Sequence, residues 1–306
     1  DLLSRLDTDI AAMNGDADGF GTADIIYGGN VGKWQKFANS LRLKLAMVIA
    51  DVDPGTAGAK IAASAALPLI TANADNALFK YVGAPNNNPL SNDVPPRSAR
   101  QDFVMANTLV DEMNTLNDPR RAAYFTTVGG EYVGGKYGFS NVYANFSTFS
   151  TKVTATTFPG NMLDASEVNF LLAEAVERGF ITGDAKSYYD AAITASLAYW
   201  GVTGVEDYLA QATVDYSNAG SGASWQEKIG TQKWIALYNR GFDAWTEWRR
   251  LDFPVLVAPD ASGVPPIPKR LIYPIIENSL NAANTKAAAA AIGGDDSATR
   301  LFWDVK

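Results

Sequence analysis

Apolar residues recur every three or four positions in several separate segments of the chain, and this spacing predicts amphipathic helices. Residues 33–50 carry such a stripe, and an Asp-Val-Asp-Pro-Gly run ends it. A second, alanine-rich helix is expected at about 57–66. A third is expected to begin at Ser98, to bury Phe103, Ala106, Val110 and Met113, and to end at Asn117. Prolines and asparagines make the intervening residues 82–98 a loop.

Residues 164–200 predict two helices joined by a short turn. Asp164 is suited to cap the first helix, with Glu167 reaching back to complete a capping box, and Gly179 is suited to end it. Gly183 and Asp184 open the second helix. Small residues on both helices permit close approach, so the pair is expected to form a tetratricopeptide-like helical hairpin that stacks on other helices.

Residues 224–250 predict one long helix. Its expected core face contains Gly241, at which we expect a close neighbour, and it carries three tryptophans and a leucine: Trp234, Leu237, Trp245 and Trp248. The proline-rich tail that follows, with Pro254, Pro259, Pro265, Pro266, Pro268 and Pro274, should run over the surface as loop. A short helix is expected around 276–292.

Residues 124–149 lack any helical period. Eight aromatic residues alternate with five glycines there, and the Gly-Gly pairs at 129–130 and 134–135 predict tight turns or short hairpins. We therefore expect a mainly α fold in which a loop-rich region with minor β structure, about 82–160, is inserted in one composite domain covering 1–306.

Composition excludes several kinds of site. The 306 residues include no Cys and no His, which rules out disulfides, thiolate or imidazole metal sites, and triads that need a His base. The net charge of −8 and the lack of a basic run argue against nucleic acid as a partner. No apolar stretch approaches the roughly 20 residues needed to span a bilayer. Because the chain starts at Asp1 without a leader pattern, we expect an internal fragment or a processed product.

Four separated segments resemble one known family, in the same order along the chain. The segments at 164–201 and 225–252 resemble the helical hairpin and long helix of the SusD/RagB family of outer-membrane nutrient-binding lipoproteins, SusD-like subgroup. The stretch "RLIYPIIENSLNAAN" at 270–284 resembles the ending of the family, and 24–54 resembles its central helix. Residues 124–138 fit its variable middle part.

The resemblance implies a binding protein and not an enzyme. Members are surface-exposed, lipid-anchored proteins of the cell outer membrane. They capture glycans or other nutrients for a SusC-like TonB-dependent transporter, which is the implied partner. We expect no cofactor and no bound metal. The lipid-bearing Cys, the signal peptide and the first helices of the family have no counterpart in this chain, so membrane contact would depend on an anchor that it lacks.

Aromatic rings on loops suit a glycan ligand, because they match the C–H faces of sugars while amides match the hydroxyl edges. Within the loop-rich region the candidates are Tyr132, Tyr137, Asn141 and Tyr143. Trp200 and Trp225, at helix ends, are secondary candidates. For each ring, packing against the helices is the alternative interpretation.

Three other hypotheses remain open at this point. Gly293-Gly294-Asp295-Asp296 offers hard oxygen atoms for Ca²⁺ but lacks the length of an EF-hand loop, which favours a solvated turn. A glycoside hydrolase would need two facing carboxylates, and Glu131, Asp243, Glu247 and Asp252 are available. A helical protein-interaction scaffold or peptide binder would not need the glycine-rich and aromatic insertion.

Overall fold

The computed structural model is mainly helical, as the apolar spacing predicted, and it describes residues 1–259 and 266–306. The longer helices are α1 (Leu2–Ala12), α2 (Val31–Val48), α3 (Pro54–Ala65), α5 (Asn107–Thr115), α7 (Ala165–Glu177), α8 (Ala185–Trp200), α10 (Trp225–Ala236), α11 (Gly241–Leu251) and α13 (Ala282–Ala291). Short helices are α4 (Pro89–Asp93), α6 (Arg121–Tyr124), α9 (Val205–Leu209) and α12 (Ile275–Leu280). Single 3-10 turns are η1 (Gly21–Ala23), η2 (Asn73–Asp75), η3 (Tyr143–Asn145) and η4 (Ala219–Ser221). Strands β1 (Ala77–Phe79) and β2 (Gly160–Leu163) pair antiparallel.

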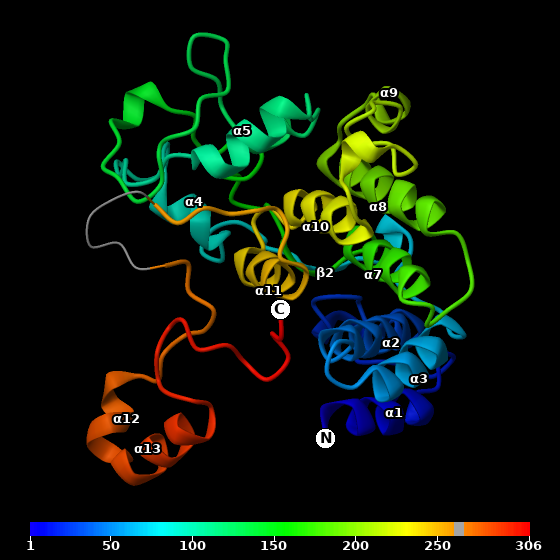
Figure 1. Ribbon diagram of the computed structural model, residues 1–306. Helices are drawn as coiled ribbons and strands as arrows, with labels where there is room; N and C mark the ends of the chain where they lie inside the picture. The colour runs from blue at the N-terminus through cyan, green and yellow to red at the C-terminus, as the bar shows by residue number, and fades with distance from the viewer. Residues whose placement is uncertain (260–265) are drawn as a thin grey trace.

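Packed helix pairs form the body of the molecule. Helices α7 and α8 make the predicted hairpin, α2 packs against α1, α3 and α7, and α10 packs against α7, α8 and α11. Figure 1 shows these helices stacked from α1 to α8, with α5 and the irregular segments around it on the opposite side of α10 and α11. Helices α12 and α13 pack mainly on each other and stand apart from the body.

The two ends of α7 follow the sequence. The Asp164 side chain accepts a hydrogen bond from the Glu167 amide (2.8 Å), and Gly179 adopts φ +70° just beyond the helix. The other half of the predicted capping box is wrong. Glu167 does not reach back to Asp164, because its carboxylate is fully buried and pairs with Arg240 and with Lys44. Burial alone would raise the pKa of the Glu167 carboxyl, but Arg240 and Lys44 outweigh it and lower the pKa to about 2.

A second set of buried charges joins α7 to α10 and α11. Arg250 contacts both Glu174 and Glu247, and Lys233 lies 2.7 Å from Glu247. All four side chains are at most 3% exposed. Buried charges of this kind must be paired, so the network fixes where the two helices meet α7.

Two predicted helix boundaries are wrong. The third helix begins at Asn107 instead of Ser98, and Phe103 is 48% exposed, although Val110 and Met113 are buried as expected. The residues before it are extended, since the Met105 amide donates to the Ser147 carbonyl and the Met105 carbonyl accepts from Gly135.

The predicted long helix at 224–250 is also two helices. Helix α10 ends at Ala236 and α11 starts at Gly241, with Asn239 at φ +65° in the corner between them. A Cβ at Gly241 would meet nothing within 4 Å, so the close neighbour expected there is not present among the described residues.

The glycine-rich segment is attached to the helices by aromatic packing. Tyr124 is fully buried, stacks on Tyr238 and meets Trp200 edge-on. The 129–130 pair makes the predicted tight turn, with φ of +61° and +91°. The 134–135 pair does not turn. Gly134 lies so close to α5 that a Cβ would be 2.3 Å from the Cα of Asn107.

The tail is loop as far as it is described, and it ends in two helices where one was expected, α12 and α13. Pro265 lies outside the described residues. Within the described ranges, no helix has both the length and the apolar character needed to cross a membrane.

Candidate functional site

Two adjoining hollows lie between α5, the α10–α11 corner and the segment 254–259. The first, which we call the α5 hollow, has a volume of about 290 Å³. Its walls come from α5, from the glycine-rich segment and from the tail: Asn107, Thr108, Glu112, Lys136, Tyr137 and residues 254–259. Residues 254–259 and the turn of α5 that carries Glu112 thus line the same hollow.

The second, the tryptophan hollow, has a volume of about 260 Å³ and shares Leu256 with the first. Three tryptophans and a tyrosine dominate its lining, which comprises Leu109, Trp234, Leu237, Tyr238, Asn239, Gly241, Ala244, Trp245, Trp248, Leu256 and Ile267. Asn239 is exposed at the corner and supplies an amide. An aromatic surface with a few polar groups is the usual composition of a small-ligand site.

The rings of the tryptophan hollow are held in place from behind. The Trp245 indole N–H donates to the Pro268 carbonyl (2.8 Å), and the Trp248 indole N–H donates to the Pro254 carbonyl (3.1 Å). The Arg249 guanidinium lies 3.7 Å from the Trp245 ring centre. Trp234 and Trp245 stay partly exposed, so each has an accessible edge or face.

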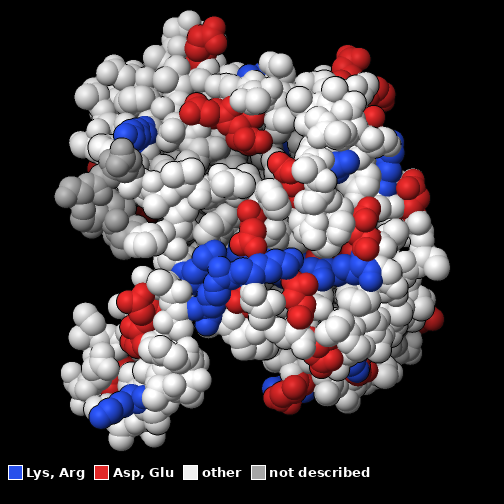
Figure 2. All heavy atoms as spheres, viewed as in Figure 1, with Lys and Arg blue, Asp and Glu red and all other residues white. Residues whose placement is uncertain are grey.

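Glu112 gives the α5 hollow a negative charge. It is half-buried, and burial together with the nearby Glu227 raises the pKa of its carboxyl. Figure 2 shows acidic side chains gathered over α5. The adjacent Asp111 is exposed.

Of the predicted site residues, Tyr137 alone lines one of these two hollows. Its hydroxyl donates to the Val257 carbonyl, which ties the glycine-rich segment to the tail. Asn141 instead closes its own loop, because its amide donates to the carbonyls of Lys136 (3.0 Å) and Phe139 (2.9 Å). Tyr132 packs half-buried against the core, with the Arg121 guanidinium 5.3 Å from its ring centre.

The other three predicted residues lie elsewhere. Tyr143 is half-buried at the start of η3 and lines neither hollow. Trp225 packs against the core beneath Arg178, whose guanidinium is 5.2 Å from the ring centre. Trp200 is only 4% exposed and stacks on Phe158, so it is a core residue whose ring offers no surface to a sugar.

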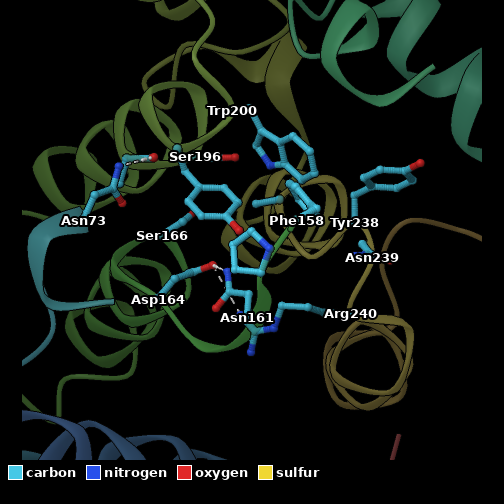
Figure 3. A pocket seen from close by; sticks show the side chains of 14 residues that line it. Asn73, Phe158, Asn161, Asp164, Ser166, Ser196, Trp200, Tyr238, Asn239 and Arg240 are labelled. Atoms are coloured by element: carbon cyan, nitrogen blue, oxygen red, sulfur yellow. Dashed lines mark hydrogen bonds and ion pairs between the residues drawn. The ribbon is translucent and has the colours of Figure 1, made fainter. Parts of the chain in front are cut away.

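Trp200 does border a small cavity at the foot of the α10–α11 corner. Figure 3 shows it enclosed by Phe158, Trp200 and Tyr238 above and by Asp164, Asn161 and Arg240 below. Its volume of about 10 Å³ is enough for about one water molecule and excludes a sugar.

Two larger hollows lie at the other end of the molecule, around α1 and the start of α2. The first, about 730 Å³, is lined by charged groups that already pair across it, such as Arg42 with Asp7 and Lys36 with Asp75. The second, about 610 Å³, is mostly apolar around the partly exposed Trp34. Neither combines several aromatic rings with free polar groups as the two hollows beside α10 and α11 do.

Two of the four carboxylates considered for hydrolysis have structural partners. Asp243 pairs with Lys44 and Arg240, and Glu247 is buried with Lys233 and Arg250, which hold its pKa well below the usual range. Asp252 ends α11 at φ +62°, and Glu131 is exposed in the 128–131 hairpin.

The acidic turn near the C-terminus also has a structural role. Asp295 accepts hydrogen bonds from the Arg270 side chain (2.6 Å) and the Tyr273 amide (3.1 Å). No cluster of acidic residues suited to a metal ion occurs among the residues with described positions.

Sequence reasoning missed Trp234, Trp245, Glu112 and the segment 254–259. The tryptophans were assigned to the core because a continuous helix would have buried them together. Asn239 and Gly241, both poor helix formers, were the available signal for a corner. Nothing local in the sequence indicates that 254–259 returns to α5.

Comparisons with known proteins agree on one family. The model of a SusD-like family, described as starch-binding and associating with the outer membrane, matches residues 1–274. A SusD homolog from Bacteroides uniformis is 33% identical with a TM-score of 0.88, and the alignment covers 99% of this chain and 72% of that one. A SusD homolog from Bacteroides ovatus is 31% identical with a TM-score of 0.87, and the alignment covers 99% of this chain and 72% of that one. A chitin-binding SusD homolog from Flavobacterium johnsoniae is 29% identical with a TM-score of 0.86. That alignment covers 99% of this chain and 71% of the homolog. None of the curated proteins matches the chain.

Proposed function

Because the chain belongs to the SusD-like family, we propose that it captures a glycan at the outer membrane and hands it on chemically unchanged. Capture is supported by the family description, which names starch binding and the outer membrane, and by the solved relatives described as chitin-binding. Hand-over to a SusC-like TonB-dependent transporter, lipid anchoring and exposure at the cell surface are proposed from the family resemblance.

The observation that carries this proposal is the pair of hollows beside α10 and α11. Half-exposed Trp234 and Trp245 offer faces for the C–H surfaces of sugar rings, and Tyr137 borders the adjoining space. Asn239 offers an amide for hydroxyl groups. Both hollows are open at the surface, which suits a segment within a long polymer.

Affinity for one short oligosaccharide should be modest, because an open site buries little of its ligand and ordering costs offset the contacts. A polymer that engages several copies of the protein at once gains through effective concentration.

The test is calorimetric titration of the purified chain with chitin and starch oligosaccharides. We expect at least one series to bind, and we expect Tyr137→Ala and Trp245→Ala each to weaken that binding about three- to tenfold. Phe302→Ala is the matched control, since Phe302 is 74% exposed and lines neither hollow. Unchanged affinity in both hollow variants would contradict the site, and release of reducing ends by the wild type would contradict capture without chemistry.

A further inference from the structure

Glu112 differs from the buried glutamates of α7 and α11 in having no cation beside it. Glu112 lines the α5 hollow, and no described residue donates a hydrogen bond to its carboxylate or forms an ion pair with it. Glu167, Glu174 and Glu247, by contrast, each contact an arginine or a lysine.

Among the residues with described positions, Lys136 is the one cation that lines the same hollow, and it is engaged elsewhere. The Lys136 ammonium lies 4.1 Å from the ring centre of Phe139, a cation–π contact within its own loop. Asn107, on the turn of α5 before Glu112, is occupied with the amide of Tyr137 (3.4 Å).

The surroundings of Glu112 favour the arrival of a positive charge. Burial and the nearby Glu227 both disfavour the ionised carboxylate of Glu112, and this raises its pKa. A cation placed against the carboxylate would stabilise the ionised form and so offset both effects. The neighbouring Asp111 and the net charge of −8 add a field that attracts cations and repels anions.

We propose that the α5 hollow selects glycans that carry a free, protonated amine, with Glu112 as the group that receives it. The ligand class is an amino sugar whose nitrogen is not acetylated, lying with its ring toward the tryptophan hollow and its ammonium toward Glu112. This inference rests on the proposed function, since it assigns the chemistry of one subsite within the same glycan site.

The experiment compares glucosamine and N-acetylglucosamine oligomers of equal length by calorimetry, using the full chain at low salt. The pH is set between the pKa of Glu112 and that of the sugar amine. A charge-assisted contact predicts that the wild type prefers the glucosamine oligomer about five- to tenfold. Glu112→Gln should bring the ratio of the two affinities to about one. Asp111→Asn, which makes the same charge change one residue away, should keep most of the preference.

The possible failures can be told apart. A wild type that binds the acetylated oligomer as well as the glucosamine oligomer, or better, overturns the role of Glu112 and leaves glycan capture standing. A preference that survives Glu112→Gln overturns it too. If the protein binds neither oligomer, the inference is wrong. If it also fails to bind starch, the proposed function is wrong. Tighter binding of a lysine-containing peptide than of the glucosamine oligomer overturns the assignment to a sugar.

Discussion

At the scale of single residues, the fold depends on a small number of buried charges. Arg250 is 1% exposed in its side chain and is shared by Glu174 and Glu247, from α7 and α11. Without Arg250, both carboxylates would stay buried and lose the cation that they share. Breaking such a buried ion pair therefore destabilises the protein more than forming it stabilises the fold.

Replacing Arg250 by Met should therefore destabilise the protein by about 3–5 kcal/mol, because two buried carboxylates lose their shared partner. Urea unfolding of wild type and variant measures this. Arg100→Met is the control: Arg100 is 56% exposed and pairs with Asp93 and Asp102 at the surface, so we expect a change within about 1 kcal/mol. Equal losses of stability from the two substitutions would show that burial does not determine how much these ion pairs contribute to stability.

Glu167 predicts a pH dependence of stability. Its pKa in the folded protein is about 2, below the 4.5 of an unperturbed glutamate, so the unfolded chain takes up the proton first as the pH falls. The stabilisation from Glu167 is complete above about pH 4.5 and is lost as the pH falls toward 2. Glu167→Gln should flatten the fall of the unfolding free energy across that interval, as measured by urea titrations at several pH values. An unaltered slope would be inconsistent with this assignment.

At the scale of helices and strands, the sequence predicted the features that depend on residues close together in the chain. The α7–α8 hairpin, its Asp164 cap and its glycine end follow from local pattern and were confirmed. The α10–α11 corner was missed. Its apolar spacing fits a continuous helix, whereas the corner is fixed by Asn239 at φ +65° and by the contact of Arg240 with Glu167, 73 residues earlier. The tryptophan hollow exists because of that corner, so it could not be predicted either.

The start of α5 was misplaced for the same kind of reason. Met105 pairs with Ser147 and Gly135, and this strand-like contact between distant segments outweighs the helical spacing of Phe103, Ala106 and Val110. Tyr137 was predicted because loops rich in aromatic residues favour sites, and the structure places it at the α5 hollow. The same rule proposed Tyr132, which packs against the core, whereas Trp200 was proposed from its place at a helix end and lies within the core.

Gly134 gives an element-scale prediction. Gly134→Ala should lower stability by about 1–3 kcal/mol, since its Cβ would lie 2.3 Å from the Cα of Asn107 and push the glycine-rich segment off α5. Gly241→Ala, where a Cβ meets nothing within 4 Å, should change stability by no more than about 0.5 kcal/mol. Thermal unfolding midpoints compare the two. If Gly134→Ala proved as mild as Gly241→Ala, the close approach of that segment to α5 would be wrong.

At the scale of the whole molecule, the helical body and the C-terminal pair α12–α13 differ in how they are held. Helix α7 is buried from Ala165 to Ala175, whereas only Thr285 is buried in the two C-terminal helices. The ion pair of Arg270 with Asp295 holds the segments before and after the pair together.

Amide hydrogen exchange should therefore show local opening of α12–α13 at much lower free energy than opening of α7, because few buried contacts oppose it. Asp295→Ala should speed exchange in the C-terminal pair further while leaving α7 unchanged. Comparable protection of α7 and α13 in the wild type would contradict this division of the molecule.

We expect the glycan to bind in the two hollows beside α10 and α11. Hydrogen exchange with and without a saturating oligosaccharide tests it most directly, because it maps the contact without assuming which side chains matter. We predict that binding slows amide exchange mainly in residues 107–112, 134–139, 234–245 and 254–259. Protection confined to the hollows around α1 and α2, with none at the α10–α11 corner, would contradict the account.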